Sequence, residues 1–371
     1  MFNIISQPKS SIENPYISVV VIAYDRKEFI QEAVKSAINQ TLERSKYEII
    51  VVKNYLDDQI DEFLNRNNVM NIYSDEKTAG SKLAIGIQNS RGEVISFLED
   101  DDLFLPLKLR EVYEIFKKNK DIVHFKHNLI GTRKVEEVKN RLNEVEVITS
   151  QIKVFHIYEL NSAKKIFRVR DKYDLGYNSS ISIRRSCYKS FIEDVKGVNN
   201  WSDLLFFFLA FKMHEESIVY VDKKPLSIYR IHDSWSRYDT NTTFDNFVIK
   251  RVRLWEEEIA AFQNFIKIIL STYSDKDSVT ALIRWLTINI NVVNVQLNLT
   301  RGSRSTLEEI LSLIQTGMYK KNAKILLSIP LIILSPLTPK LVKKIFMLGL
   351  ASSMAVVIDD TSTLYTPRKS S

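Results

Sequence analysis

The stretch Val94-Ile-Ser-Phe-Leu-Glu-Asp-Asp-Asp-Leu103 decides the fold and directs the search for function. Its first five residues, four of them apolar, are typical of a buried strand. Four consecutive carboxylates, Glu99 to Asp102, follow at once, and they repel one another unless a positive charge lies among them. A hard divalent cation, held by one or two carboxylates and by phosphates, would supply that charge. The alternative is a solvated acidic turn before the helix that we expect from about Leu105.

Strand and helix signals alternate around this stretch from residue 17 to about residue 128. The pattern predicts strands at 17–23, 48–52, 70–73, 94–98 and 121–127, with helices at 29–38, 60–64, 82–89 and 105–116. Such alternation indicates a parallel, doubly wound α/β sheet. Ligands of such sheets bind beyond the carboxyl ends of the strands, which is where the four carboxylates lie.

The remainder of the chain is less regular. Residues 130–175 are polar and predict an irregular, lid-like connection. Short strands are expected at 177–185, 217–221 and 226–231, and the apolar segment 204–211 predicts a buried helix. From residue 244 to about 315 the pattern is mainly helical.

Composition narrows the class of protein. With 45% hydrophobic and 26% charged residues, the chain is typical of a globular protein and not of a disordered one. Cys187 is the only cysteine, which excludes an intrachain disulfide and favours a reducing compartment. The first residues contain no apolar core long enough for a secretory signal, so we expect a cytoplasmic protein.

The net charge of +7 is concentrated near the C-terminus. Residues 311–357 contain six lysines and no acidic residue, so the rest of the chain carries only +1. This distribution argues against a general nucleic-acid surface, and we expect no nucleic-acid partner.

Two further segments carry candidate ligand contacts. The first strand ends in Ala23-Tyr24-Asp25-Arg26, where Asp25 either caps the next helix or contacts a nucleotide. Lys82, near the start of a helix, is either a solvated surface lysine or a partner of a diphosphate at the positive helix end.

Taken in order, these segments resemble the inverting family 2 glycosyltransferases. The resemblance rests on SVVVIAYDR (18–26), EIIVV (48–52) and GSKLAIGIQNSRGEVISFLEDDDLFLPLKL (80–109), which correspond to the family's first strand, second strand, glycine-containing helix and acidic D-x-D strand end. It covers residues 17 to about 128 well and extends more loosely to about 235. The resemblance implies a GT-A fold, a Rossmann-like sheet, here followed by a helical C-terminal extension.

The resemblance also implies roles for the residues that match the family's motifs. Asp101 would be the ligand of a Mg²⁺ or Mn²⁺ ion, and Glu99 would contact the donor ribose or the surroundings of the metal. Asp100 is placed with the donor-binding residues, although it and Asp102 could do no more than shape the turn. Tyr24 and Asp25 would lie along the nucleotide, and Lys82 near its base or phosphates.

One departure from the family concerns the end of the second strand. The family has two acidic residues there, the first of which contacts the base, whereas this chain has Lys53-Asn54. Asn54 or Asp58 could take over this contact, or Lys53 could pair with the donor. Glu99 in place of the usual aspartate is a smaller departure, because the charge is kept.

The catalytic base and a second group of contacts to the donor are expected farther along the chain. NNWSDLLFF (199–207) matches the context of the family's catalytic aspartate, so Asp203 is the candidate base, with helix-dipole stabilisation as the alternative. YRIHDSWS (229–236) resembles a family element in which Arg230 would contact donor phosphates and His232 the metal. The alternative for both is a structural role.

The C-terminal segment contains two uncharged stretches, 325–339 and 345–358. Each is shorter than the about 20 apolar residues that cross a bilayer. Lysines beside short apolar segments favour helices that lie in an anionic membrane surface, and buried helices are the alternative. We therefore divide the chain into a catalytic domain (1–235, with halves 17–128 for the donor and 129–235 for the acceptor), a helical extension (236–320) and a basic, apolar tail (321–371).

The resulting hypothesis is a metal-assisted, inverting glycosyltransferase. Its donor would be a UDP-, GDP- or dTDP-sugar, and its acceptor a glycan, lipid or protein near the inner face of the membrane, with the enzyme peripheral on that face. A sugar-nucleotide pyrophosphorylase would need a glycine-rich loop after the first strand, and Ala23-Tyr24-Asp25-Arg26 contains no glycine. The alternative that stays open is a non-catalytic, membrane-associated scaffold with a degenerate nucleotide-sugar site.

Overall fold

The structure is a computed structural model of the 371-residue chain. It describes residues 2–7, 13–141, 150–173, 176–198, 201–232, 244–271, 276–301 and 303–320, with isolated positions between 330 and 346. The chain forms two compact units, one of residues 1–159 and 175–230, the other of 160–174 and 231–371. Each unit is described by itself.

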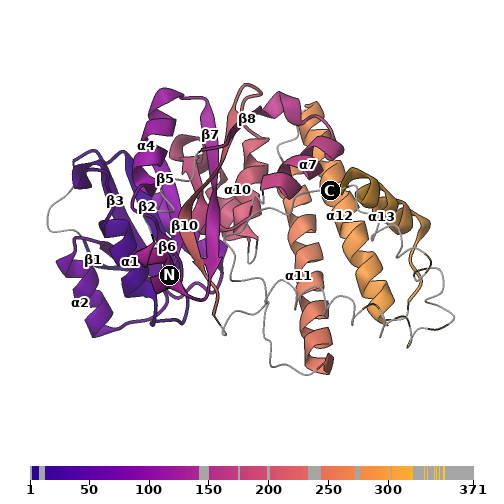
Figure 1. Cartoon of the computed structure of the whole chain (residues 1–371), viewed down its shortest axis with the longest axis horizontal. Coiled ribbons are helices and arrows are strands. Elements are labelled where there is room, and N and C mark those ends of the chain that lie inside the picture. Colours follow the sequence, from indigo (N-terminus) through magenta and orange to yellow (C-terminus); the bar gives the residue numbers. More distant parts are fainter. Residues whose placement is uncertain are drawn as a thin grey trace. The chain divides into compact units, whose positions relative to one another are not determined.

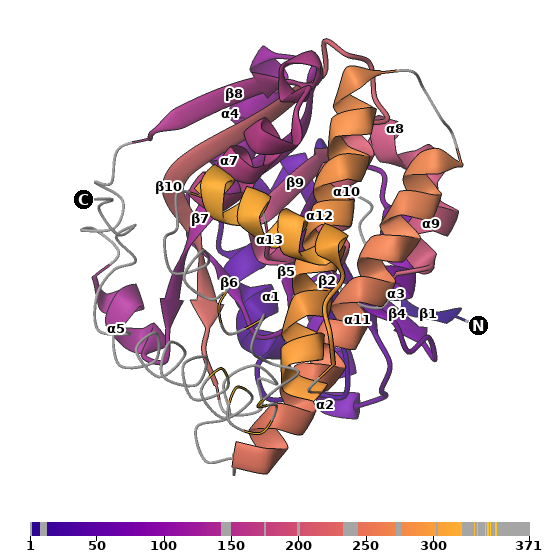
Figure 2. The ribbon, with the colours of Figure 1, turned by 90° about the vertical axis from the view of Figure 1, so that its right-hand side faces the viewer.

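A ten-stranded mixed sheet forms the centre of the first unit (Figure 1). Its order is β1-β4-β3-β2-β5-β9-β7-β10-β6, and β8 pairs with β10 beside this path, as Figure 2 shows. The strands in chain order are β1 Phe2–Ser6, β2 Ile17–Ala23, β3 Tyr47–Lys53, β4 Met70–Ser74, β5 Val94–Glu99, β6 Leu103–Phe104, β7 Ile122–Thr132, β8 Ile152–His156, β9 Ile181–Arg184 and β10 Ile218–Arg230.

The parallel core agrees with the alternation in the sequence. Strands β4, β3, β2 and β5 are parallel neighbours, and Ile22 of β2 lies opposite Glu99 of β5. The predicted parallel sheet of residues 17–128 is not continuous, because β9 lies between β5 and β7 and runs antiparallel to both. The short helical turn Asn178–Ser180 precedes β9, so the chain enters this strand from the edge where β5 ends.

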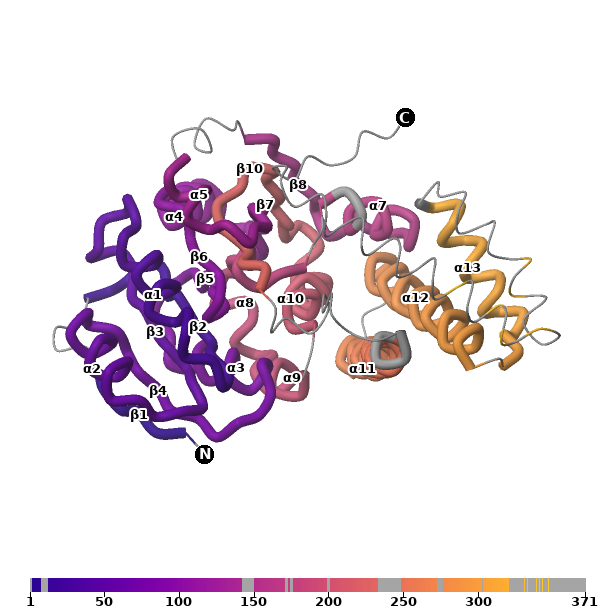
Figure 3. Tube along the Cα trace, turned by 60° about the horizontal axis from the view of Figure 1, so that its bottom comes forward, coloured from indigo at the N-terminus to yellow at the C-terminus, as the bar shows by residue number. Residues whose placement is uncertain are grey.

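Helices cover both faces of the sheet (Figure 3). Alternate residues of β2 point to opposite faces: Val19 and Val21 pack in the core with α1, α2 and α4, whereas Val20 lies against Gly86 of α3. The helices of this unit are α1 Ile30–Ile38, α2 Asp58–Arg66, α3 Ala79–Asn89, α4 Lys108–Lys118, α5 Val135–Asn140, α8 Arg185–Tyr188, α9 Ile192–Lys196 and α10 Ser202–Ala210, with 3-10 turns at Arg44–Lys46, Ile157–Leu160, Asn178–Ser180 and Lys189–Phe191.

Helix α10 confirms the expectation of a buried helix in the segment 204–211. Every residue of α10 from Leu204 to Ala210 is buried. The ring of Phe206 stacks on Phe97 of β5, with ring centres 4.5 Å apart. This packing attaches the start of α10 to the strand that carries the four carboxylates.

The second unit is helical in its described parts. It contains α7 Ala163–Tyr173, α11 Phe244–Leu270, α12 Asp277–Arg301 and α13 Leu307–Lys320. Trp285 of α12 packs against Phe167 of α7 and Phe262 of α11, at ring-centre distances of 5.7 and 6.0 Å. Helix α12 has the length and apolar composition of a membrane span, and half of its apolar window is buried.

The expectation that residues 130–175 are irregular is wrong for their described part. Strand β7 continues to Thr132, β8 extends the sheet, and α7 forms within AKKIFRVRDKY. The buried residues of α7 include Ala163, Ile166 and Phe167, whose spacing is helical although the surrounding residues are charged. The many charges conceal this apolar face in the sequence.

The predicted membrane-surface tail lies mostly outside the described residues. Of its described positions, Ile332 and Val342 are buried with Val295 and Leu299 of α12. The functional division of the chain into the ranges 1–235, 236–320 and 321–371 stays a prediction.

Gly80 allows α3 to lie against α9. A Cβ atom at this position would lie 2.1 Å from the carbonyl oxygen of Val195 and 2.4 Å from that of Val198. The Gly80 N–H also donates to Val198 O at 3.1 Å. We expect Gly80→Ala to lower the free energy of unfolding by about 3 kcal/mol, because backbone atoms must shift.

Urea unfolding measures this effect. Gln88→Ala is the matched control, since Gln88 is exposed on the same helix, and we expect its stability to stay close to that of the wild type. A Gly80→Ala protein as stable as the wild type would show that α3 does not pack on α9 in this way.

Candidate active site

The four carboxylates from Glu99 to Asp102, here called the acidic turn, connect β5 to β6. The Asp102 N–H donates to the carbonyl oxygen of Glu99 at 3.2 Å, which closes a tight turn. Strand β6 then pairs with β10 through Leu103 opposite Ile228. The acidic turn is therefore attached to the sheet on both sides, at the carboxyl ends of β2 and β5.

Burial disfavours the ionised forms of the carboxylates in the acidic turn. Asp100, Asp101 and Asp102 are only 2%, 5% and 1% exposed. Burial, reinforced by the charge of Asp101, raises the pKa of Glu99 to about 7. Burial likewise raises the pKa of Asp100 to about 7, and that of Asp102 well above its ordinary value. A cation among these groups would stabilise their ionised forms.

Three carboxylates of the turn have the arrangement of a metal site. Glu99, Asp101 and Asp102 each offer an oxygen, and these oxygens lie within 4.8 Å of one another. An all-oxygen donor set of this kind fits Mg²⁺ or Mn²⁺. Asp102 was not expected as a ligand from the sequence, because only the closure of the turn brings it next to Glu99.

Arg26 supplies a positive charge to the turn. This residue follows β2, and its Nη2 lies 2.5 Å from Asp100 Oδ1, while its Nη1 lies 2.6 Å from Asp101 Oδ2. The guanidinium thus bridges two carboxylates that are consecutive in the chain. The sequence contained a signal for this role only in the position of Arg26 at the end of the neighbouring strand.

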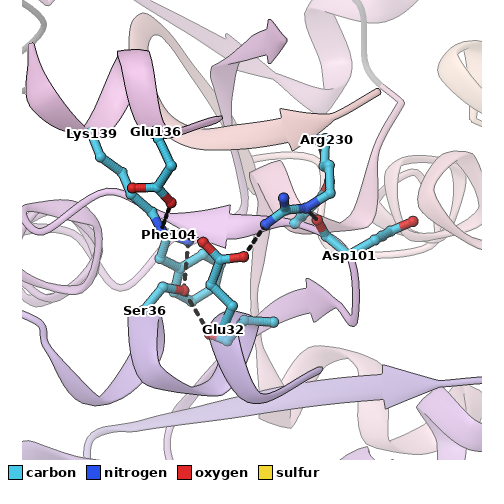
Figure 4. A network of polar contacts seen from close by, with 9 residues as sticks. Glu32, Ser36, Asp101, Phe104, Glu136, Lys139 and Arg230 are labelled. Carbon is cyan, nitrogen blue, oxygen red and sulfur yellow. Dashed lines mark hydrogen bonds and ion pairs between the residues drawn. The ribbon is translucent and has the colours of Figure 1, made fainter. Parts of the chain in front are cut away.

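Arg230, at the end of β10, donates hydrogen bonds to the acidic turn (Figure 4). Its Nε donates to the carbonyl oxygen of Asp101 at 2.9 Å, and its backbone N–H donates to Asp102 Oδ1 at 3.1 Å. The same guanidinium forms an ion pair with Glu32 of α1 and lies over the ring of Phe29, 4.6 Å from its centre. Arg230 therefore orients the turn, and its predicted contact with donor phosphates stays a prediction.

Asp203 lies in the first turn of α10, close to Glu99. Its negative charge is one of the causes of the raised pKa of Glu99. Asp203 Oδ2 accepts a hydrogen bond from the Tyr177 N–H at 2.6 Å, and Oδ1 accepts one from the Leu204 N–H at 2.8 Å. These two backbone donors hold the carboxylate in one orientation.

Asn178 links the acidic turn to α10. Its Nδ2 donates to Glu99 Oε1 at 3.0 Å and to Ser202 Oγ at 3.2 Å. The neighbouring Tyr177 and Trp201 have φ values of 72° and 66°. Left-handed backbone at non-glycine residues is costly and concentrates at functional sites. Nothing in the sequence pattern around Asn178 predicted this link.

Tyr24, Asp25 and Asn54 come together at the ends of β2 and β3. Asn54 Nδ2 donates to Asp25 Oδ1 at 2.7 Å, and the Asp25 N–H donates to Asn54 Oδ1 at 2.9 Å. The ring of Tyr24 is 46% exposed and has Lys82 Nζ 4.4 Å from its centre. An exposed aromatic ring beside a polar pair can stack against the nucleobase of a ligand.

Two lysines near this edge have structural partners. Lys82 is 1% exposed and its Nζ donates to the carbonyl oxygen of Glu76, while burial lowers its pKa. The interpretation of Lys82 as a solvated surface lysine is therefore wrong. Lys53 is fully buried, with Nζ 2.8 Å from Asp61 Oδ1, so the hypothesis that it pairs with the donor is wrong in this structure. Asp58 is the first residue of α2.

The structure thus gathers most of the predicted residues into two neighbouring groups. Around the acidic turn it places Glu99, Asp100, Asp101, Asp203 and Arg230, and to these it adds Arg26, Asp102 and Asn178. At the ends of β2 and β3 it places Tyr24, Asp25 and Asn54, with Lys82 under the ring. His232 follows β10 and belongs to the second unit, so its role as a metal ligand stays a prediction.

Sequence comparison supports the resemblance. Residues 18–188 match the family described as Glycosyl transferase family 2. An uncharacterized glycosyltransferase of Rickettsia prowazekii is 30% identical over 119 residues, which are 31% of this chain and 37% of that relative. The glycosyltransferase AglE of Haloferax volcanii is 32% identical over 93 residues, 24% of this chain and 31% of that protein. The matched region thus spans about a third of the length of each of these relatives.

Solved structures share the fold. One match is the structure of S. aureus TarS 1-349 in complex with UDP-GlcNAc, with a TM-score of 0.52 at 14% identity. The superposed region covers 91% of this chain and 92% of the TarS chain. The mannosyltransferase of Pyrobaculum calidifontis, in complex with GDP-Man and Mn²⁺, has a TM-score of 0.51 at 11% identity, with 96% and 90% covered. Together with the parallel β-α core that ends in the acidic turn, these matches show that the chain has a GT-A fold and that its residues 18–188 are similar to glycosyl transferase family 2.

Proposed function

We propose that this protein is an inverting, metal-assisted glycosyltransferase that moves a sugar from a nucleotide sugar to an acceptor hydroxyl. The observation that carries the proposal is the placement of Asp203, a carboxylate oriented by two backbone N–H groups, near the carboxylate oxygens of Glu99, Asp101 and Asp102. A base and a cation site are the two elements that such a transfer requires.

The roles follow from the chemistry of each group. Glu99, Asp101 and Asp102 would hold Mg²⁺ or Mn²⁺, and the bound ion would neutralise the charge that develops on the leaving diphosphate. Asp203 takes the proton of the acceptor hydroxyl. The hydroxyl oxygen bonds to the anomeric carbon of the donor sugar, and the bond from that carbon to the phosphate oxygen breaks. The opposite-side attack inverts the configuration at that carbon.

Nucleotide binding is assigned to the ends of β2 and β3. Tyr24 offers a ring face to the base, and the pair of Asp25 and Asn54 offers hydrogen-bonding groups beside it. Lys82, buried beneath the ring, contributes a positive charge that favours the nucleotide phosphates. Support for this class of donor comes from the solved relatives that contain UDP-GlcNAc and GDP-Man.

A thermal-shift screen tests the donor assignment. UDP-, GDP- and dTDP-sugars are each added with Mg²⁺ or Mn²⁺, and donors that raise the melting temperature are then assayed for metal-dependent hydrolysis and for transfer to glycan, lipid and protein acceptors. We expect one nucleotide class to stabilise the protein only together with the metal. If no donor binds and none is turned over, the proposed transferase activity is wrong and the non-catalytic scaffold is the remaining hypothesis.

We also propose that the enzyme works in the cytoplasm, on the inner face of the membrane. The support is the concentration of six lysines and two uncharged stretches in residues 311–358. The full chain is expected to sediment with anionic lipid vesicles at low salt, and a chain ending at residue 324 is expected to remain in the supernatant. Equal sedimentation of two folded proteins would contradict this proposal.

A further inference from the structure

The position of Arg26 has a consequence for metal binding. Its guanidinium lies on Asp101 Oδ2 at 2.6 Å and on Asp100 Oδ1 at 2.5 Å. Asp101 is one of the three carboxylates that could hold a cation, whereas Asp100 is outside that group. Arg26 thus already supplies positive charge at one of the proposed ligands.

A divalent cation and the guanidinium would compete at Asp101. The side chain of Asp101 is 7% exposed, so the repulsion between two cations beside it would be weakly screened. The side chain of Arg26 is 30% exposed, which gives it a route away from Asp101 without unfolding of the core. Because Asp100 stands outside the metal group, moving away from Asp101 need not remove every partner of Arg26.

We propose that Arg26 is a built-in counter-cation of the acidic turn, which the metal displaces from Asp101 and which then pairs with the donor diphosphate. This inference rests on the proposed function and adds a residue that couples the metal to the donor. The physical basis is the planar guanidinium, whose paired N–H groups suit phosphate as well as carboxylate. Without a donor, Arg26 weakens metal binding; with a donor, it strengthens nucleotide binding.

The two effects have opposite signs, which separates them from a merely structural role. Removing Arg26 is expected to tighten the binding of Mn²⁺ alone and to weaken the binding of UDP or GDP in saturating Mn²⁺. A residue that only shapes the turn would weaken both when it is removed. The chain also offers a matched control in Lys27, whose Nζ pairs with Asp57 at 3.0 Å and which carries the same charge in the same loop.

The experiment measures Mn²⁺ binding to wild type, Arg26→Gln and Lys27→Gln by the electron paramagnetic resonance signal of free Mn²⁺. The three proteins are compared in the same buffer and at the same pH. We expect Arg26→Gln to bind Mn²⁺ roughly tenfold more tightly than the wild type, because a charged hydrogen-bonding competitor is lost. Lys27→Gln should stay within about twofold, as for a partly screened surface charge.

Nucleotide binding is measured next, by calorimetric titration of UDP and of GDP in saturating Mn²⁺. Arg26→Gln is expected to bind the preferred nucleotide roughly tenfold more weakly than Lys27→Gln does, since one charged contact to phosphate is missing. If Arg26→Gln does not fold, Arg26→Lys takes its place. Its single ammonium cannot bridge both carboxylates, so a smaller gain in Mn²⁺ affinity is expected.

Each other result overturns the inference. Unchanged or weaker Mn²⁺ binding in Arg26→Gln, an equal change in Lys27→Gln, or an Arg26→Lys protein identical to the wild type would show that Arg26 does not compete with the metal. Unchanged nucleotide binding would remove the diphosphate contact. If wild type and variants all fail to bind Mn²⁺, the inference falls together with the metal site, whereas normal Mn²⁺ and nucleotide binding in the wild type with no effect of Arg26 overturns the inference alone.

Discussion

Asp203→Asn is expected to abolish sugar transfer and to leave donor binding nearly unchanged. The amide cannot accept the proton of the acceptor hydroxyl, and a positioned general base typically contributes about 10²- to 10⁴-fold to the rate. Binding of the nucleotide depends on residues at the ends of β2 and β3 and on the acidic turn, none of which is altered. The rate of transfer falls by about that factor, while the dissociation constant of the nucleotide stays within about twofold.

The transfer rate and the nucleotide dissociation constant are measured separately. Transfer is followed with the donor found in the thermal-shift screen, and nucleotide binding by calorimetry in the presence of Mn²⁺. Asp121→Asn is the matched control, because Asp121 is exposed before β7 and the substitution changes the net charge equally.

The hydrogen bonds of Asp203 provide a check on folding. Its two oxygens accept from the Tyr177 and Leu204 N–H groups, and an asparagine has one acceptor oxygen in place of two. A loss of stability would therefore appear in thermal unfolding and could be distinguished from a loss of chemistry. A folded Asp203→Asn protein that retains transfer within about tenfold of the wild type would exclude Asp203 as the base.

Asp101→Asn is expected to remove metal-dependent donor binding. The substitution replaces one of the three carboxylates whose oxygens lie within 4.8 Å of one another. Changes in groups that only support a metal ligand cost roughly 10- to 100-fold in affinity, so the loss of a direct ligand should cost at least as much. Titration with Mn²⁺ and with nucleotide in Mn²⁺ measures both losses.

Asp100→Asn is the control for the charge of the acidic turn. Asp100 is the neighbour of Asp101 and shares the guanidinium of Arg26, yet it is not in the group of three carboxylates. Its substitution is expected to weaken Mn²⁺ binding much less than Asp101→Asn does. Unchanged Mn²⁺ and donor affinity in Asp101→Asn would contradict the assignment of this residue as a ligand.

The sequence alone determined the parallel half of the sheet and the location of the site. The runs 17–23, 48–52, 70–73 and 94–98 are mainly apolar, and they form most of β2, β3, β4 and β5. Such strands are buried on both faces, so local composition is sufficient to recognise them. Their order along the chain also placed Glu99 to Asp102 at a carboxyl end, where the structure has them.

Tertiary structure alone decided which residues meet at the site. Arg26 and Asp100 are separated by 74 residues, and Asn178 and Glu99 by 79, so no local periodicity reports these contacts. Local periodicity also does not report the partner of Lys53. This residue stands where the family has an acidic residue, and in the structure it pairs with Asp61. The physical reason is that burial of a charge requires a partner, and the fold selects that partner from distant segments.

The difference is clearest within the acidic turn itself. By composition alone the four consecutive acids are equivalent, and only the family resemblance singled out Asp101 as a ligand with Glu99 in support. Closure of the turn by the Asp102 N–H brings Asp102 beside Glu99 and Asp101, while Asp100 lies on Arg26. Local patterns therefore determined that negative charge collects here, because strand propensity and hydrophobic runs act over a few residues. Only the packing around the turn decided which carboxylates could face a metal, because their partners Arg26, Asn178 and Arg230 come from three distant segments of the chain.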